Sequence, residues 1–205
     1  MLSEIRTGVI TSSDGGVNPG RSDKQGALVI TQGHGDYTEA SVRQNLFAAQ
    51  AINTAPVIYT TAAGTGGPLI WNGSTSKNVN IIGASISISV VSTVAGSVGL
   101  TGNVGQVSAP GSTTAIDSVR NLYLGGSAPA ATAYRVGTPT NAGDFFIPLF
   151  EISTGALTVS FGFPNFIDVN GILTIPPGSW CALAGSATLT TLQARMSLVW
   201  EEIPI

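Results

Sequence analysis

The stretch Phe166-Ile-Asp-Val-Asn-Gly-Ile-Leu-Thr-Ile-Pro-Pro-Gly-Ser-Trp-Cys-Ala-Leu-Ala-Gly185, which leads into a strand ending near Trp200, decides the fold that we predict. Asn170-Gly171 is the two-residue signal of a type I′ hairpin turn, because both central positions of that turn need positive φ. Pro176-Pro177-Gly178 ends the following strand, since a proline has no N–H to donate to a ladder. Trp180 to Ala184 then begins another strand.

The last strand carries the plainest alternation in the chain. One face is apolar and the other polar: Leu192, Ala194, Met196, Leu198 and Trp200 against Gln193, Arg195 and Ser197. A period of two residues predicts a half-buried antiparallel strand. We expect Trp200 to be buried and Glu202 to lie in solvent at the strand end.

The composition indicates a protein whose faces are covered by neighbours. The chain has 205 residues, enough for one β-sandwich with an arm, and only 9% of them are charged, against about a quarter in ordinary soluble domains. A surface built from small neutral residues suits an oligomer better than a free monomer. A rigid secreted domain is the alternative.

Net charge and hydropathy exclude several classes of partner. The net charge is −3 and the sequence contains no Lys/Arg cluster, so we expect no nucleic-acid binding. The apolar runs are too short to span a membrane, and the first residues lack a signal-peptide pattern; we therefore expect synthesis in a cytoplasm. The single cysteine, Cys181, cannot form an internal disulfide and is expected in the core.

Charge is concentrated at the front of the chain, where residues 1–50 hold nine of the nineteen charged side chains. Thr11 to Gln25 is rich in turn and loop residues and has little to bury. We interpret 1–25 as an extended N-terminal arm that is ordered only against a partner, with a disordered tail as the alternative. Residues 26–205 are predicted to form the sandwich, beginning with a short strand at Ala27–Thr31 and a tight loop at Gly33–Tyr37.

Short strands separated by Gly/Pro turns follow. They are predicted at Pro56–Thr61, Pro68–Trp71, Val79–Val91, Val98–Val107, Phe145–Ile152 and Leu157–Phe163. Thr38 to Ala51 fits a helix, or a strand from Leu46 to Ile52, and we favour the strand for its second half. Ser112–Leu124 is predicted as a short helix stopped by Gly125, and Gly126–Gly143 as a long loop. The pattern predicts an all-β, antiparallel, jelly-roll-like sandwich.

The sequence offers no set of catalytic, cofactor-binding or metal-binding residues. His34 is the only histidine, and without a nucleophile motif its neighbour Asp36 does not make a catalytic triad. One histidine and one cysteine cannot form a zinc site. The acids of the strand-rich region, which are Asp144, Glu151 and Asp168, lie at predicted strand ends as solvated turn acids commonly do. Asn72-Gly73-Ser74 matches a glycosylation acceptor and is interpreted as a turn.

Aromatic residues could form a sugar-binding platform, but they are scattered along the chain: Tyr37, Tyr59, Trp71, Tyr123 and Tyr134. The three tryptophans, Trp71, Trp180 and Trp200, occupy strand positions, where packing in a core or an interface is the usual role.

Three segments together resemble small structural proteins of tailed bacteriophages. They are Gly33-x-Gly-Asp-Tyr-Thr-Glu-Ala-Ser-x-x-x-Asn-Leu-Phe47, Ile175-Pro-Pro-Gly178 and Ser197-Leu-Val-Trp-Glu-Glu-Ile-Pro204. The resemblance runs from about Gly26 to the C-terminus and leaves the arm uncovered. It implies a jelly-roll decoration (cement) protein of the virion, commonly trimeric, without cofactor or metal.

We therefore expect a non-enzymatic capsid decoration protein on the virion surface that forms a homotrimer. Its arm, residues 1–25, is the candidate contact with the major capsid protein. A receptor- or glycan-binding module of a head or tail fibre is the alternative, and it would need an exposed aromatic and acidic cleft. A polysaccharide depolymerase would need an acid pair in a groove.

Overall fold

The computed structural model describes residues 37–54, 56, 58–60, 66–90, 92–116, 118–152, 154, 165–189 and 191–205. The chain divides into two units, Met1–Glu39 and Ala40–Ile205, and the second contains all the described strands. The predicted arm 1–25, the predicted strands at Ala27–Thr31 and Leu157–Phe163, and most of the loop at Gly33–Tyr37 lie outside the described residues.

One short helix precedes the described strands. These elements are α1 (Thr38–Val42), β1 (Leu46–Thr54), β2 (Leu69–Asn72), β3 (Lys77–Val90), β4 (Gly96–Asn103), β5 (Gly111–Ala115), β6 (Ser118–Asn121), β7 (Thr132–Thr138), β8 (Ile147–Ile152), β9 (Asn165–Ile175), β10 (Ser179–Gly185) and β11 (Gln193–Pro204). The segment Thr38 to Ala51, whose sequence fits a helix or a strand, contains both α1 and the start of β1. The strand that we favoured for its second half is confirmed.

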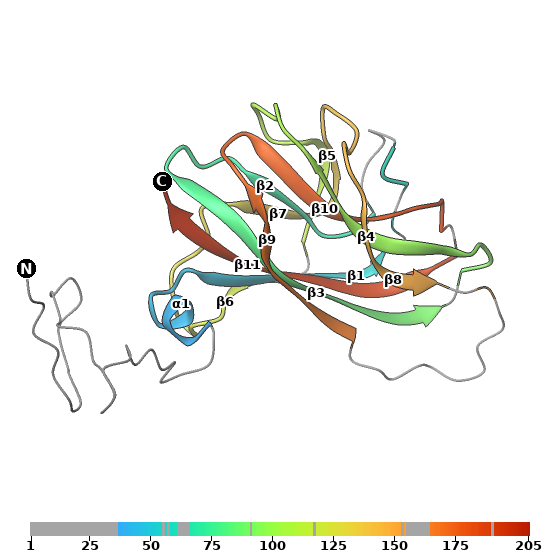
Figure 1. Cartoon of the computed structure of the whole chain (residues 1–205), viewed down its shortest axis with the longest axis horizontal. Helices are drawn as coiled ribbons and strands as arrows, with labels where there is room; N and C mark the ends of the chain where they lie inside the picture. Colours follow the sequence, from blue (N-terminus) through green and yellow to red (C-terminus); the bar gives the residue numbers. More distant parts are fainter. Residues whose placement is uncertain are drawn as a thin grey trace, which may run out of the picture. The chain divides into compact units, whose positions relative to one another are not determined.

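The strands form two antiparallel sheets that pack face to face (Figure 1). The five-stranded sheet has the order β6-β1-β11-β3-β9, and the six-stranded sheet has the order β5-β7-β2-β10-β4-β8. Within them β1 pairs with β11, β2 with β10, β3 with β9 and β4 with β8. This is the pairing of one long hairpin rolled up on itself, so the predicted jelly-roll sandwich is confirmed. The connection between β4 and β8 adds β5, β6 and β7, which widen both sheets.

The core lies between the sheets, and β11 supplies its centre. Leu192, Ala194, Met196, Leu198 and Trp200 are all buried, as the alternation predicted. Phe47 of β1 is the register partner of Trp200, and their rings stack with centroids 5.8 Å apart. Ile70, Leu100 and Leu183 cover them from the other sheet. Full burial of an aliphatic side chain contributes about 1.5–3 kcal/mol.

Strand β3 reverses its inward face at a β-bulge. Ala84 and Ile86 point inward as predicted, whereas Val79 and Ile81 are buried at positions of the opposite parity. The register shifts between Ile81 and Gly83 against β9, and between the corresponding residues of β11. An extra residue in the ladder turns the side chains that follow it to the other face, so both halves of the strand bury their apolar positions.

The Asn170-Gly171 pair does not make a hairpin, and that prediction is wrong. Both residues have the positive φ that the signal requires, 54° and 71°. However, β9 runs along β3 on both sides of the pair, with Asp168 opposite Gly83 and Leu173 opposite Ile81. The residues between them, Val169–Ile172, form an excursion from the edge strand. The chain instead crosses between the sheets at Pro176-Pro177-Gly178, where Gly178 has φ 71°.

Three other predicted elements are corrected. Ser112–Leu124 contains strands β5 and β6 in place of a helix, because pairing with β7 and β1 outweighs the apolar spacing that fits a helix. The predicted loop Gly126–Gly143 contains β7. In Pro56–Thr61 the described residues show only an isolated bridge from Ile58 to Gly185. Strand β4 also ends earlier than predicted, at Asn103.

Candidate interaction surfaces

Glu202 is fully buried, which corrects the expectation that it lies in solvent. It continues the inward parity of β11, and its carboxylate has three partners. One oxygen accepts from Lys77 Nζ at 2.9 Å and from the Ala130 N–H at 3.0 Å; the other accepts from the Ala131 N–H at 2.9 Å. A buried carboxylate is tolerable because charge-assisted hydrogen bonds replace its hydration. Glu202 thereby holds the end of the loop that connects β6 to β7.

Asn121 and Gln44 hold the start of the same loop. The Asn121 side-chain amide donates to the main-chain oxygens of Gln44 and Ser127 at 2.9 and 3.0 Å, and its Oδ1 accepts from the Tyr123 N–H. Gln44 Oε1 accepts from the Ser127 N–H at 3.1 Å. Residues 122–131, which we name the β6–β7 loop, are therefore fixed at both ends by contacts with distant parts of the chain.

A groove of about 550 Å³ opens between this loop and the strands that it joins. Its walls come from Val119–Asn121 of β6, Thr132 and Ala133 of β7 and the loop itself, including Leu124, Pro129 and Ala131. Ala131 and Ala133 belong to the main hydrophobic core, so the groove reaches the edge of that core. At its rim Leu124 is 88% exposed, which is unusual for a leucine held in a fixed loop.

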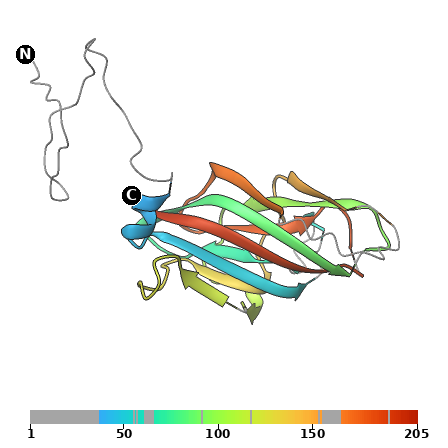
Figure 2. The ribbon, with the colours of Figure 1, turned by 90° about the horizontal axis from the view of Figure 1, so that it is seen from below.

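The five-stranded sheet turns one face away from the other sheet, and Figure 2 shows β1, β11 and β3 side by side in it. Most of the side chains placed outward by the register of β1, β11 and β3 are uncharged: Ala48, Gln50, Ser85, Ser87, Ser197 and Val199. Two larger groups lie on the same face: Arg195 of β11, which is opposite Ser87, and Phe166 of β9, whose ring lies over Gly83. Arg120 lies beside Ala48 at one edge, and Asp168 lies beside Gly83 at the other. Depletion of charged residues is a feature of the centre of protein–protein interfaces. We name this surface the flat face.

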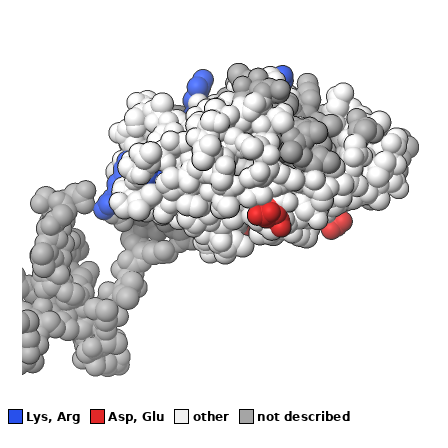
Figure 3. Space-filling model, turned by 90° about the horizontal axis from the view of Figure 1, so that it is seen from above, with Lys and Arg blue, Asp and Glu red and all other residues white. Residues whose placement is uncertain are grey.

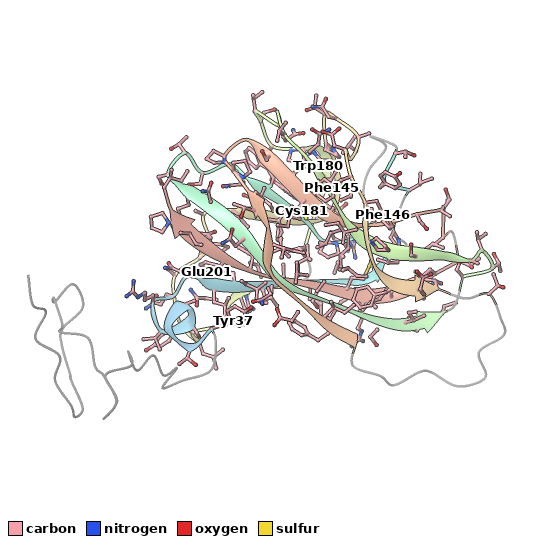
Figure 4. The ribbon with its side chains drawn as sticks, in the orientation of Figure 1. Tyr37, Phe145, Phe146, Trp180, Cys181 and Glu201 are labelled. Carbon is pink, nitrogen blue, oxygen red and sulfur yellow. The ribbon has the colours of Figure 1, made fainter. Side chains whose placement is uncertain are left out.

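Glu201 adjoins the flat face on the outward side of β11 (Figure 4). Partial burial raises the pKa of its carboxyl group above the usual value. The two successive glutamates thus lie on opposite faces of one strand, in two different environments.

A smaller recess of about 140 Å³ lies among β4, β9 and β10 (Figure 4). Trp180 and Phe145 line it together with Asp144, so an acid and two aromatic rings do meet there. Trp180 is only 3% exposed, however, so its ring offers no open face on which a sugar could stack. The recess therefore fits an apolar group of side-chain size better than a glycan.

The other aromatic residues mostly pack against neighbours. Tyr59 stacks on Phe146 with centroids 5.0 Å apart, and Trp71 donates its indole N–H to the Gln106 carbonyl at 3.0 Å. Trp71 and Tyr134 also pack against Leu69, Trp180 and Ala182. Tyr123 alone of this group lies in the β6–β7 loop, 46% exposed. Packing, the role expected for the three tryptophans, is confirmed.

The residues considered for chemistry are not gathered into one site. His34 and Asp36 lie outside the described residues, and Asp144, Glu151 and Asp168 are exposed on separate elements. Within the described ranges, no group of three potential metal ligands is present. Cys181 is fully buried, and burial raises the pKa of its thiol far above the usual value. The side-chain amide of Asn72 is buried and donates to the Lys77 and Ile175 carbonyls. These contacts suit the interpretation of Asn72-Gly73-Ser74 as a turn.

Comparison with known proteins identifies no relative of this chain. No protein-family model, curated protein or solved structure matches it. Across the described residues, no helix has the length and apolar character needed to cross a membrane.

Proposed function

We propose that this chain is a non-enzymatic virion protein that decorates and stabilises a capsid shell. The flat face carries the proposal: most of its outward side chains are small and uncharged, and the centres of protein–protein interfaces are depleted in charged residues. The jelly roll is a fold of viral capsid proteins among others, so it is compatible with this role without specifying it. On the side of the molecule that Figure 3 shows, acidic and basic groups are few and lie apart from one another. A low density of charge also suits a surface covered by another protein.

Stabilisation would follow from mass action. A protein that binds the assembled shell and not its free subunits stabilises the shell by RT ln(1 + [L]/Kd) per site, where [L] is the concentration of the free protein. Many weak sites therefore add up to a large effect. In this proposal the protein acts as an oligomer, a homotrimer, and residues 1–25 contact the major capsid protein.

The alternative is a receptor- or glycan-binding module of a head or tail fibre. The observation in its favour is the recess that brings Asp144, Phe145 and Trp180 together. Its small volume and the burial of Trp180 weigh against a sugar-binding role, so we prefer the decoration role.

The decisive experiment locates the protein on purified virus particles. Quantitative mass spectrometry should give many copies per particle, and electron microscopy should place them over the head. A few copies at the tail would favour the fibre module, and absence from particles would reject both roles.

Two variants sharpen this test. Removing residues 1–25 should leave the unfolding transition unchanged, because all the described strands lie in Ala40–Ile205, and should weaken attachment to particles that lack the native protein. His34→Ala should attach normally. If the protein released reducing sugar from host polysaccharide, and His34→Ala abolished that release, the non-enzymatic role would be wrong.

A further inference from the structure

Strand β6 is an edge strand with main-chain groups directed away from the sheet. Among the described strands it pairs only with β1, with Asn121 opposite Phe47 and Val119 opposite Ala49. Beyond the strand, the Leu122 N–H donates to the Leu46 carbonyl at 2.9 Å. Hydrogen-bonded and non-hydrogen-bonded pairs alternate in an antiparallel ladder. Arg120 and Ser118 therefore bond to β1, and Val119 and Asn121 direct their N–H and C=O groups to the free edge.

The position of Arg120 agrees with this assignment. Its guanidinium donates to the Val119 carbonyl at 3.0 Å in an exposed contact. A charged side chain that covers an edge carbonyl is one of the ways in which proteins protect a free strand edge. The contact is exposed to solvent and can be exchanged for a main-chain hydrogen bond at little cost.

The free edge borders the groove described above. Val119, Arg120 and Asn121 form one wall, and the core residues Ala131 and Ala133 form another. The β6–β7 loop adds Leu124, which lines the groove and is 88% exposed; Leu122 and Tyr123, just before it, are 42% and 46% exposed. An added strand needs unpaired main-chain N–H and C=O groups at a sheet edge and a pocket beside them for its side chains. The edge of β6 and the adjoining groove supply both.

The other edges of the described sheets are less suited to this. Strand β9 is broken by the excursion at Val169–Ile172, and β8 carries Pro148 and the charged Glu151. Strand β5 pairs with β7 through two register shifts. Bulges, prolines and charges all discourage further pairing.

We propose that the segment Ala27–Thr31 of a neighbouring copy of this chain adds to the free edge of β6. The segment reads Ala-Leu-Val-Ile-Thr, is uncharged and is about as long as β6. In an extended conformation Leu28 and Ile30 point to one side, toward the groove, while Val29 points to the other. The groove floor of alanines leaves room for two larger aliphatic side chains.

The length of chain ahead of the sandwich permits this exchange. Residues 1–36 precede the described part, and the compact unit begins at Ala40. The seven residues from Thr31 to Thr38, where α1 begins, can span about 24 Å when extended. Each copy would donate one segment and accept another, and such head-to-tail contacts close into rings such as a trimer. The inference thus rests on the self-association in the proposed function and identifies the contact that produces it.

Cross-linking of two proteins that each carry one introduced cysteine tests the proposal directly. One full-length protein carries Val29→Cys and the other carries Leu124→Cys; native Cys181 is buried in both. After mixing, a short bismaleimide should join the two chains into a species of twice the 20.8 kDa chain mass. A matched mixture with Ile172→Cys, which is 75% exposed on β9, should give none.

Sedimentation tests the same contact without cross-linking. Leu28→Ser combined with Ile30→Ser should shift the protein from an oligomer to the 20.8 kDa monomer. Val9→Ser with Ile10→Ser, the matched apolar pair of the arm, should not. On the groove side, Leu124→Asp should dissociate the oligomer and Ile172→Asp should leave it intact.

The outcomes separate this proposal from the proposed function. An unchanged oligomer in the Leu28/Ile30 and Leu124 variants, or the absence of a cross-link between the Val29→Cys and Leu124→Cys proteins, would overturn the exchange. Either result would leave capsid decoration open to its own particle-binding test. Conversely, exchange between copies of a protein that is absent from particles would support this inference and reject the decoration role.

Discussion

Replacing Glu202 by alanine should destabilise the sandwich by about 2–4 kcal/mol. The carboxylate is fully buried, and its three donors lie within 3.0 Å. Its removal would leave the part-buried Ala130 N–H and the buried Ala131 N–H without their acceptor, and a buried main-chain group in that state costs about 1–3 kcal/mol. Breaking a buried ion pair costs about 3–5 kcal/mol; we place Glu202→Ala lower because the Lys77 side chain is 32% exposed and can regain water.

Glu201→Ala is the matched control, because it removes the same side chain one residue away on the outward face. Surface substitutions of this kind usually change stability by about 0.5 kcal/mol or less. Trp200→Ala gives the scale for a lost core side chain, about 3–5 kcal/mol. Glu202→Ala should therefore fall close to Trp200→Ala and far from Glu201→Ala, whereas a solvent-exposed Glu202 would give the opposite grouping.

Urea unfolding followed by tryptophan fluorescence measures these differences by linear extrapolation. Protein concentration must be equal throughout, because self-association adds to apparent stability. Native-state hydrogen exchange adds a local measurement: the Ala130 and Ala131 amides should exchange faster in Glu202→Ala than in Glu201→Ala. If both glutamate variants unfold within about 0.5 kcal/mol of each other, Glu202 does not hold the β6–β7 loop.

Three further predictions concern other parts of the sandwich. Cys181 should react with thiol reagents only as fast as the native protein opens, because it is buried and its thiol pKa is raised; fast stoichiometric labelling of folded protein would contradict this. Gly99→Ala should cost about 1–3 kcal/mol because a Cβ there would overlap the Ile147 carbonyl, whereas one at Gly111 has its nearest neighbour 3.9 Å away. Equal melting temperatures for Gly99→Ala and Gly111→Ala would show that the β4–β8 contact is not tight. Burial raises the pKa of Glu201, so the folded state binds its proton more readily and stability falls as pH rises from the ordinary to the raised value. Glu201→Gln should therefore have a larger free energy of unfolding than wild type at pH 7, and this difference should shrink as the pH falls toward about 4. A difference that grows on acidification would contradict the raised pKa.

The sequence alone determined the properties that depend on alternation within one strand. Leu192 to Trp200 specified the inward face of β11, since consecutive side chains of a strand point to opposite faces whatever lies beside it. Cys181 and the run around it likewise specified a buried strand. Many short strands with Gly/Pro turns and almost no helical pattern were enough to indicate a sandwich.

Tertiary structure decided what depends on the neighbouring strand. Asn170 and Gly171 have the positive φ that their sequence predicts. They do not form a hairpin because the residues before and after them both pair with β3. Ser112–Leu124 satisfies both a helical and an extended pattern, and pairing with β1 and β7 selects the strands. The partners of Glu202 are 71, 72 and 125 positions away in the chain. Its parity could have indicated burial, but only the folded sheets bring Lys77, Ala130 and Ala131 to its carboxylate, because contacts over such separations leave no local pattern in a single sequence.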